Sequence, residues 1–185
     1  MWEENDIKEV LFTGEQISER AKQLGAQITK DYSEKGSKPF FVALLKGSVP
    51  FLVELTRNID LDLQFDFMDV SSYEGTESTG DIRILKDLDI SVKGMDIIIV
   101  EDIVDTGRTL STVCELLLHR GAASVKIATL LDKPSRRIND VRPEYVGFEV
   151  GNQFVVGYGM DFNQRYRALP YVGICLLYTS PSPRG

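Results

Sequence analysis

Two short, mainly apolar runs constrain the fold more than any other feature of this sequence. One covers residues 40–45 (FFVALL) and the other covers residues 95–100 (MDIIIV). Runs of this length and character are typical of strands that are buried on both faces of a parallel sheet. Each run leads into a polar or glycine-containing stretch and then into a helical pattern. We therefore expect strands that are joined by helices.

The rest of the chain continues this alternation. Residues 13–16 (TGEQ) have the form of a capping box, and apolar residues follow at helical spacing from Ile17 to Ile28. Further patterns predict a helix over residues 49–58, strands over 61–71, 81–88 and 125–131, a helix from about Leu110 to Gly121, and late strands over 145–150 and 154–158. Strands that alternate with helices indicate an α/β domain with a mostly parallel twisted sheet flanked by helices.

Composition excludes several classes of protein. The chain has 185 residues, which suits one domain, and a formal charge of −7 from 28 acidic and 21 basic residues. An acidic chain is a poor candidate for a nucleic-acid-binding protein. The apolar runs are far shorter than the ~18–20 residues that cross a bilayer. Cys114 and Cys175 have no metal-ligand spacing and the start of the chain is polar, so we expect a cytoplasmic protein with no membrane partner.

Residues 100–110 (VEDIVDTGRTL) carry the strongest chemical signal. In α/β sheets, ligands bind beyond the carboxyl ends of the strands, which is where this string lies. A Thr- and Gly-rich turn before a helix offers unpaired N–H groups and hydroxyls to a phosphate. Gly107 leaves room for the backbone to come close to that phosphate. The string therefore predicts a phosphate-monoester site.

The same string contains the carboxylates Glu101, Asp102 and Asp105. Ionised carboxylates only accept hydrogen bonds, so beside a phosphate they call for a ligand with hydroxyl donors, such as a ribose. A divalent cation would offset the remaining repulsion. We therefore expect a phosphorylated ribose as ligand and a divalent cation as cofactor.

The eleven-residue string closely resembles the signature of type I phosphoribosyltransferases, which bind 5-phosphoribosyl-1-pyrophosphate. The resemblance to one branch, the hypoxanthine-guanine phosphoribosyltransferases of bacterial type, runs from about Asp6 to Ile174. Its other segments are residues 45–48 (LKGS), 71–73 (SSY), 78–80 (STG), 130–134 (LLDKP) and 154–161 (FVVGYGMD). It implies the type I phosphoribosyltransferase fold with a small hood built from chain-terminal segments, all within one domain over residues 1–174.

The resemblance also assigns roles to individual residues. It implies that ribose and 5′-phosphate are bound by Glu101, Asp102, Asp105, Thr106, Gly107, Arg108 and Thr109. It implies pyrophosphate binding by Lys46, Gly47 and Arg167, base binding by Lys133, Phe154 and Val155, a lid loop with Ser72 and Tyr73, and Mg²⁺ binding by Glu101, Asp102 and Asp161. Family members often have a cis peptide at the loop lysine, here Lys46.

The implied reaction is purine salvage, in which N9 of hypoxanthine or guanine displaces pyrophosphate from C1 of the ribose. Asp105 is the expected general base for the proton on N7. The Lys133 ammonium has only hydrogen-bond donors. It would therefore donate to a 6-oxo group and select against bases with a 6-amino group. Closure of the lid would exclude water from the activated ribose. Family members are dimers or tetramers, so we expect a homodimer or homotetramer.

Three alternatives remain at this point. The chain could be a xanthine-preferring phosphoribosyltransferase, a pyrimidine-operon attenuator that binds RNA on the same fold, or a ligand-binding homologue without activity. The charge of −7 argues against the RNA-binding protein. Retention of Glu101, Asp102, Asp105, Lys133 and Asp161 argues against lost catalysis.

The last eleven residues, 175–185 (CLLYTSPSPRG), differ in character from the rest of the chain. They look like a translated transposon-library sequencing adapter from assembled metagenomic reads. We therefore expect a non-native tail, with a genuine disordered tail as the alternative. The apolar residues 175–177 could still extend a terminal strand by chance.

Overall fold

The computed structural model describes residues 6–72 and 81–176. Its helices are α1 (Gly14–Lys35), α2 (Val49–Thr56) and α3 (Arg108–His119), with a 3₁₀ turn, η2 (Pro134–Arg136). Its strands are β1 (Ile7–Phe12), β2 (Phe40–Leu44), β3 (Gln64–Ser72), β4 (Ile82–Lys86), β5 (Asp96–Val104), β6 (Ser124–Asp132), β7 (Tyr145–Glu149), β8 (Val155–Val156) and β9 (Val172–Cys175). No helix in this part of the chain is both long and apolar enough to pass through a bilayer.

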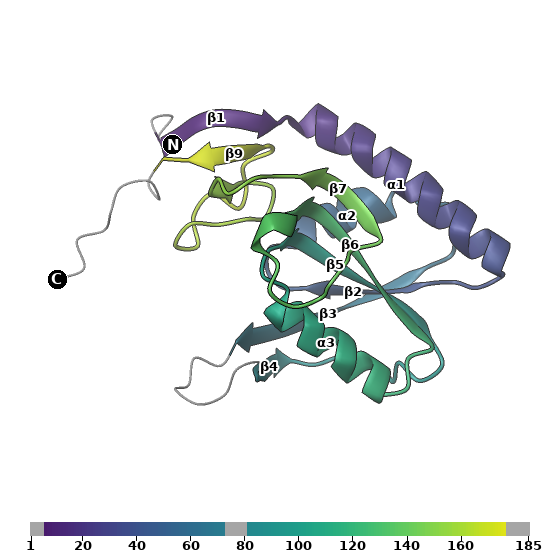
Figure 1. Cartoon of the computed structure of the whole chain (residues 1–185). Coiled ribbons are helices and arrows are strands. Elements are labelled where there is room, and N and C mark those ends of the chain that lie inside the picture. The colour runs from purple at the N-terminus through teal and green to yellow at the C-terminus, as the bar shows by residue number, and fades with distance from the viewer. Residues whose placement is uncertain (1–5, 73–80, 177–185) are drawn as a thin grey trace.

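The larger sheet has six strands in the order β4-β3-β2-β5-β6-β7. Strands β3, β2, β5, β6 and β7 are parallel to their neighbours, and β4 joins the edge antiparallel to β3. Helices α1 and α2 cover one face of this sheet and α3 covers the other (Figure 1). The predicted mostly parallel α/β sheet flanked by helices is confirmed.

The two apolar runs are buried on both faces, as predicted. In β5, Ile98 and Val100 pack into the cluster on the α1 side, whereas Ile97 and Ile99 pack into the cluster on the α3 side. All four side chains are fully buried. Alternate residues of a strand point to opposite faces, so a strand covered by helices on both sides must be apolar throughout.

The boundary of β5 differs from the prediction. The sequence predicted that the strand would end at Val100, but it continues to Val104, and α3 begins at Arg108 rather than Leu110. The reason is pairing with β6, where Ile103 lies opposite Leu131 and Val104 lies opposite Asp132. Glu101 and Asp102 therefore stand on a rigid strand, and the loop shrinks to residues 105–107.

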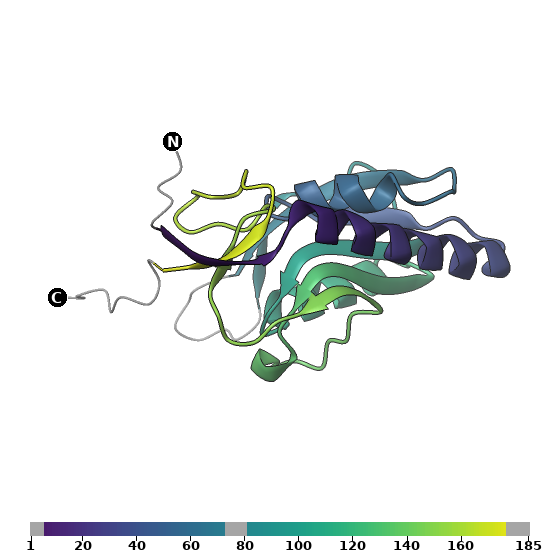
Figure 2. The same cartoon turned by 90° about the horizontal axis from the view of Figure 1, so that it is seen from above.

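A second, three-stranded sheet forms the predicted hood from both ends of the chain. Its order is β1-β9-β8, and Figure 2 shows it displaced from the main sheet beyond the start of α1. The strand predicted over residues 154–158 is reduced to β8 because Gly157 and Tyr158 have φ values of 94° and 49°, which an extended strand does not allow.

Helix α1 links the hood to the main sheet. The predicted capping box is present, since the Thr13 N–H donates to Gln16 Oε1 at 2.9 Å and the Gln16 N–H donates to Thr13 Oγ1 at 3.2 Å.

At the other end of the chain, Cys175 completes β9 opposite Ile7. It lies inside the segment 175–185 that the sequence sets apart, and residues 177–185 lie outside the described residues.

Candidate functional site

The candidate site lies where the carboxyl ends of β2, β5 and β6 meet. From β2 the chain passes through α2 to β3 on one side, and from β5 it passes through α3 to β6 on the other side. The boundary between β2 and β5 is therefore a topological switch point, the usual ligand position in open α/β sheets. The loops at residues 45–48 and 105–107 and the residue Lys133 all follow these strand ends.

The loop after β2 packs tightly against two other segments through Gly47. A Cβ atom on Gly47 would lie 1.8 Å from Asp102 Oδ2, and a Cβ atom on Gly159 would lie 1.9 Å from the Gly47 carbonyl oxygen. The peptide between Leu45 and Lys46 is cis, as the resemblance implied. Only glycine fits at residues 47 and 159, so these glycines allow the loop to contact both β5 and the segment after β8.

The predicted pyrophosphate ligands Lys46, Gly47 and Arg167 are brought together around this loop. Arg167 Nη1 donates to the Gly159 carbonyl at 2.7 Å. Lys46 Nζ and Arg167 Nη2 both donate to Gln164 Oε1, at 3.3 and 3.1 Å. Gln164 was not predicted, since nothing in its sequence context marks it as a bridge between two cations. Two cations with one shared acceptor form a site suited to an anion.

Little positive charge offsets the acid pair Glu101 and Asp102 on β5. Burial raises the pKa of Glu101 well above its ordinary value, and the neighbouring charge of Asp102 raises it further. Burial also raises the pKa of Asp102, although hydrogen bonds from Glu101 and from the Ile103 N–H and the charge of Arg167 oppose this shift. Two adjacent, partly buried acids are costly unless a cation or a shared proton offsets their charge.

The predicted Mg²⁺ ligands do not form a complete protein site. Within residues 6–72 and 81–176, no group of three His, Cys, Asp or Glu side chains could hold a metal ion. Asp161, predicted to join Glu101 and Asp102, instead pairs with Arg167 at 3.3 Å and accepts the Gln164 N–H at 2.8 Å. Mg²⁺ is commonly bound by one or two carboxylates together with substrate phosphates. The pair Glu101 and Asp102 fits that kind of site.

The predicted phosphate loop surrounds a pocket of about 170 Å³. Its lining consists of Glu101, Ile103, Val104, Asp105, Thr106, Gly107, Arg108, Thr109 and Leu110. Gly107 has a φ of 79° and stands immediately before the first turn of α3, so the N–H groups of that turn face the loop, where the Arg108 N–H donates to Thr106 Oγ1 at 3.4 Å. The residues predicted for phosphate binding, 105–109, thus line a small pocket at a helix N-terminus, a place where anions commonly bind.

The carboxylate of Asp105, the predicted general base, is held by an arginine that the sequence reasoning missed. Arg136 Nε donates to Asp105 Oδ1 at 2.7 Å, and both side chains are about half exposed. The only available signal was the basic pair Arg136 and Arg137 shortly after Lys133. A pair of adjacent arginines is common on protein surfaces, so it did not stand out.

Lys133, predicted to bind the base, is buried and paired with a main-chain oxygen. Its side chain is 6% exposed, and Nζ donates to the Gln153 carbonyl at 2.8 Å. Burial lowers the pKa of Lys133, while the charge of Asp105 raises it. Gln153 immediately precedes Phe154, whose partly buried ring meets Phe162 edge to face at 5.8 Å. Val155 pairs with Ile174 in the hood, so the three predicted base ligands lie at the junction of the hood and β6.

The lid prediction can be followed only in part. Ser72 is the last residue of β3 and is exposed. Tyr73 lies outside the described residues. The carboxyl end of β3, where Ser72 stands, lies at the same edge of the sheet as the loops described above (Figure 1).

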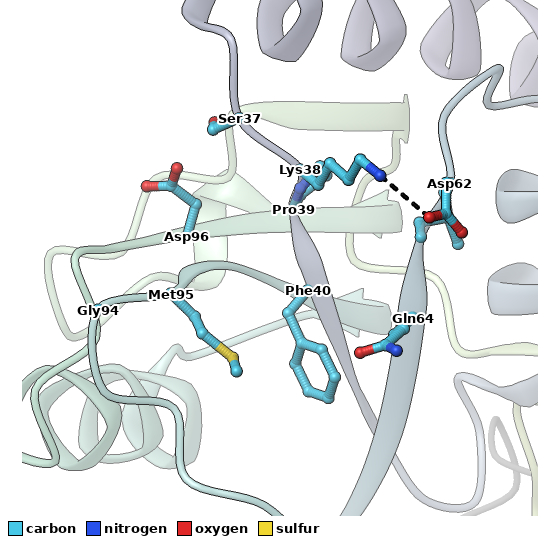
Figure 3. A pocket seen from close by; sticks show the side chains of 10 residues that line it. Ser37, Lys38, Pro39, Phe40, Asp62, Gln64, Gly94, Met95 and Asp96 are labelled. Carbon is cyan, nitrogen blue, oxygen red and sulfur yellow. Dashed lines mark hydrogen bonds and ion pairs between the residues drawn. The ribbon is translucent and has the colours of Figure 1, made fainter.

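A larger hollow of about 410 Å³ lies at the opposite edge of the main sheet, where β2, β3 and β5 begin (Figure 3). Lys38 and Asp62 form an ion pair of 3.0 Å across it, and Phe40 and Met95 line its apolar side. Among the described residues, its lining includes none of those predicted for the site. Volume alone is therefore a poor guide to the chemistry of this molecule.

Comparisons with known proteins agree with this geometry. Residues 12–163 match the family model of the phosphoribosyl transferase domain. The chain is 54% identical over 169 residues to the hypoxanthine-guanine phosphoribosyltransferase of Lactococcus lactis subsp. lactis (strain IL1403), with 91% of each chain covered. It is 51% identical over 172 residues to the enzyme of that name from Streptococcus thermophilus (strain CNRZ 1066), with 92% of this chain and 94% of the relative covered.

A crystal structure of a hypoxanthine phosphoribosyltransferase from Staphylococcus aureus superposes with a TM-score of 0.90 at 49% identity, covering 96% of each chain. The three comparisons agree with one another. The family model, the relatives over nearly the whole chain and the solved structure all indicate the same family. The chain belongs to the phosphoribosyltransferase family, in the branch of the hypoxanthine-guanine phosphoribosyltransferases.

Proposed function

We propose that this chain transfers the phosphoribosyl group of 5-phosphoribosyl-1-pyrophosphate to N9 of hypoxanthine or guanine and releases pyrophosphate. The observation that carries the proposal is the single edge of the sheet that gathers a phosphate pocket, an acid pair, an anion site and a buried lysine. These four features match the 5′-phosphate, the ribose hydroxyls, the pyrophosphate and the 6-oxo group of the two substrates. The names of the relatives favour hypoxanthine and guanine over xanthine or a regulatory RNA ligand.

The residues around the two loops position phosphoribosyl pyrophosphate. The N–H groups and hydroxyls of residues 106–109 bind the 5′-phosphate. Glu101 and Asp102 accept hydrogen bonds from the ribose hydroxyls. Lys46 and Arg167 exchange their shared acceptor Gln164 for the pyrophosphate oxygens. Fixing both ends of the ribose holds C1 in line for attack and stabilises the charge that develops on the leaving group.

Asp105 and Lys133 act on the base. Lys133 donates to the 6-oxo group once the base replaces the Gln153 carbonyl, and it has no acceptor for a 6-amino group. Asp105 takes the proton from N7 as N9 attacks C1. Phe154 stacks on the purine, and the main chain of Val155 reads its edge. Ser72 and Tyr73 belong to the lid that excludes water from the activated ribose.

Mg²⁺ is part of the proposal because the acid pair lacks a compensating charge. Glu101 and Asp102 would hold the ion together with oxygens of the substrate, and Asp161 would contact it through the pyrophosphate side of the site. When bound, Mg²⁺ neutralises charge on the pyrophosphate. Its presence is tested by the Mg²⁺ dependence of phosphoribosyl pyrophosphate binding, measured by calorimetry with and without a chelator.

We infer a cytoplasmic homodimer or homotetramer that uses only small-molecule substrates. Cys114, the cysteine outside the proposed non-native tail, is a free thiol, which suits a reducing compartment. Exposed apolar side chains such as Phe65 and Leu85 could be covered by a second copy. Sedimentation velocity of the purified protein distinguishes the two assemblies. Residues 1–174 form the proposed functional domain, and residues 175–185 the proposed non-native tail.

The deciding experiment compares the wild type with Asp105→Asn. The variant keeps the shape of the side chain but cannot accept a proton, so we expect unchanged binding of phosphoribosyl pyrophosphate and a kcat that falls by about 10²- to 10⁴-fold. The measurement is steady-state kinetics with hypoxanthine, guanine, xanthine and uracil in the presence of Mg²⁺. A near-normal kcat would exclude the base role, and preferred turnover of xanthine or uracil would overturn the substrate assignment.

A further inference from the structure

The segment after β6 contacts the phosphate loop residue by residue. Arg136 holds the Asp105 side chain through Oδ1 at 2.7 Å, and Arg137 Nη1 donates to the Asp105 carbonyl at 3.4 Å. The next two N–H groups, at residues 138 and 139, donate to the Thr106 carbonyl at 2.9 and 3.2 Å. Hydrogen bonds from residues 137–139 therefore fix the main chain of the loop, and Arg136 fixes the side chain of Asp105.

The Arg136 contact restricts the orientation of the Asp105 carboxylate. A carboxylate has two oxygens with about four lone-pair directions. Arg136 engages one of these oxygens, so the second remains able to accept a proton from a ligand. A guanidinium is planar and rigid, and it therefore orients a carboxylate more strictly than a lysine ammonium does.

We propose that Arg136 is a positioning residue that holds Asp105 in the orientation needed to take the purine N7 proton. The inference rests on the function proposed above, and on the same Asp105. Arg136 itself contacts neither substrate in this assignment and acts only through the carboxylate.

The charges around Asp105 support positioning rather than a large electrostatic effect. Arg136, Arg137 and Lys133 all lie on the side of β6 and η2, and the acid pair Glu101 and Asp102 lies on β5. With 50% of Arg136 and 43% of the Asp105 side chain exposed, water screens their attraction. Loss of Arg136 leaves two cations near Asp105 but removes the contact that sets its geometry.

A second arginine–aspartate pair in the same segment provides a matched control. Arg142 Nε lies 3.1 Å from Asp140 Oδ1, with 88% and 83% of the side chains exposed. It has the same pair of side chains and the same donor atom, but Asp140 belongs to no part of the proposed site. Any general effect of removing one positive charge from this segment appears equally in both variants.

The first test compares Arg136→Gln, Arg136→Lys and Arg142→Gln by steady-state kinetics. For Arg136→Gln we expect a kcat about tenfold lower, because a misplaced catalytic group is costly, with KM for phosphoribosyl pyrophosphate changed less than twofold. Arg136→Lys restores part of kcat, and Arg142→Gln matches the wild type. An increase in KM with unchanged kcat would mean that Arg136 binds a phosphate directly, which overturns the proposal. Equal effects in the Arg136 and Arg142 variants overturn it as well.

The second test repeats Arg136→Gln in the Asp105→Asn background. If Arg136 acts through Asp105, it has no further effect on kcat there, so the two changes are strongly non-additive. Additive losses overturn the positioning role even if Asp105 is the base. The failure of the proposed base role is seen separately, as a normal kcat of the Asp105→Asn single variant.

Discussion

The acids at the two edges of the main sheet differ in how their charge is compensated. At the edge where the strands begin, Asp96 is 9% exposed and accepts hydrogen bonds from Lys35 and Ser124, each at 2.6 Å. These contacts outweigh burial and lower the pKa of Asp96. At the edge where the strands end, burial raises the pKa of both Glu101 and Asp102. A compensated buried acid stabilises the fold, whereas an uncompensated one leaves part of its interactions for a ligand.

The largest expected effect comes from the glycine that lets the loop after β2 contact β5. Gly47→Ala places a Cβ within 1.8 Å of Asp102 Oδ2, so the loop or the acid must move. We expect kcat/KM for phosphoribosyl pyrophosphate to fall by at least about 10²-fold, because displacements of about 1 Å have this effect on a positioned site.

The control is Gly94→Ala at the opposite edge. Gly94 has a φ of 76° with open space around it, so alanine there costs about 1 kcal/mol of backbone strain and leaves kinetics unchanged. Normal kinetics for Gly47→Ala, measured beside this control, would show that the loop tolerates displacement. The two edges of the sheet would then not differ in their importance for activity.

Asp96→Ala should produce the reverse pattern, a loss of stability without a loss of activity. The change leaves Lys35 and Ser124 without their common acceptor, and hydrogen bonds to a charged group contribute about 1.5–3 kcal/mol. We expect the free energy of unfolding in urea to fall by about 2 kcal/mol, with kcat and KM as in the wild type. A reduced kcat for the folded variant would contradict the division between the two edges.

Glu101→Gln should stabilise the free protein while weakening substrate binding. The raised pKa means that the folded chain keeps a proton that the unfolded chain releases above its ordinary value of 4.5. The wild type therefore loses stability as pH rises above that value, and the glutamine variant does not. We expect a Tm higher by ~2–4 °C at pH 8 and convergence of the two proteins at about pH 4, below the ordinary pKa.

Calorimetric titration of the same variant with phosphoribosyl pyrophosphate and Mg²⁺ supplies the second half of this test. Loss of the carboxylate should raise Kd because the ribose hydroxyls and the cation lose an acceptor. A variant that is stabilised and still binds with wild-type affinity would show that the acid pair destabilises the fold without contributing to substrate binding.

The smallest effect is expected at the ion pair across the larger hollow. Lys38 and Asp62 are 63% and 88% exposed, and such pairs contribute at most about 1 kcal/mol. Lys38→Ala should change the free energy of unfolding by less than about 0.5 kcal/mol and leave all kinetic constants unchanged. A kinetic effect here would mean that the amino edge also influences catalysis.

The sequence by itself determined the fold class, and it named most of the residues that the structure brings together at the candidate site. The runs at residues 40–45 and 95–100 favoured strands covered on both faces, and the spacing after Thr13 favoured a capped helix. Residues 101–109 predicted a phosphate site because all the residues that the prediction needs lie in one contiguous string. Local patterns of this kind depend on neighbours in the chain, which a sequence shows directly.

Only the tertiary structure decided which distant residues complete that site. The extension of β5 to Val104 depends on its pairing with β6. The need for glycine at residue 47 depends on Asp102, and the need for glycine at residue 159 depends on the Gly47 carbonyl. The contacts of Arg136 with Asp105 and of Gln164 with Lys46 join residues that are 31 and 118 positions apart. Such contacts arise from the packing of separate elements against each other, and no local pattern records them.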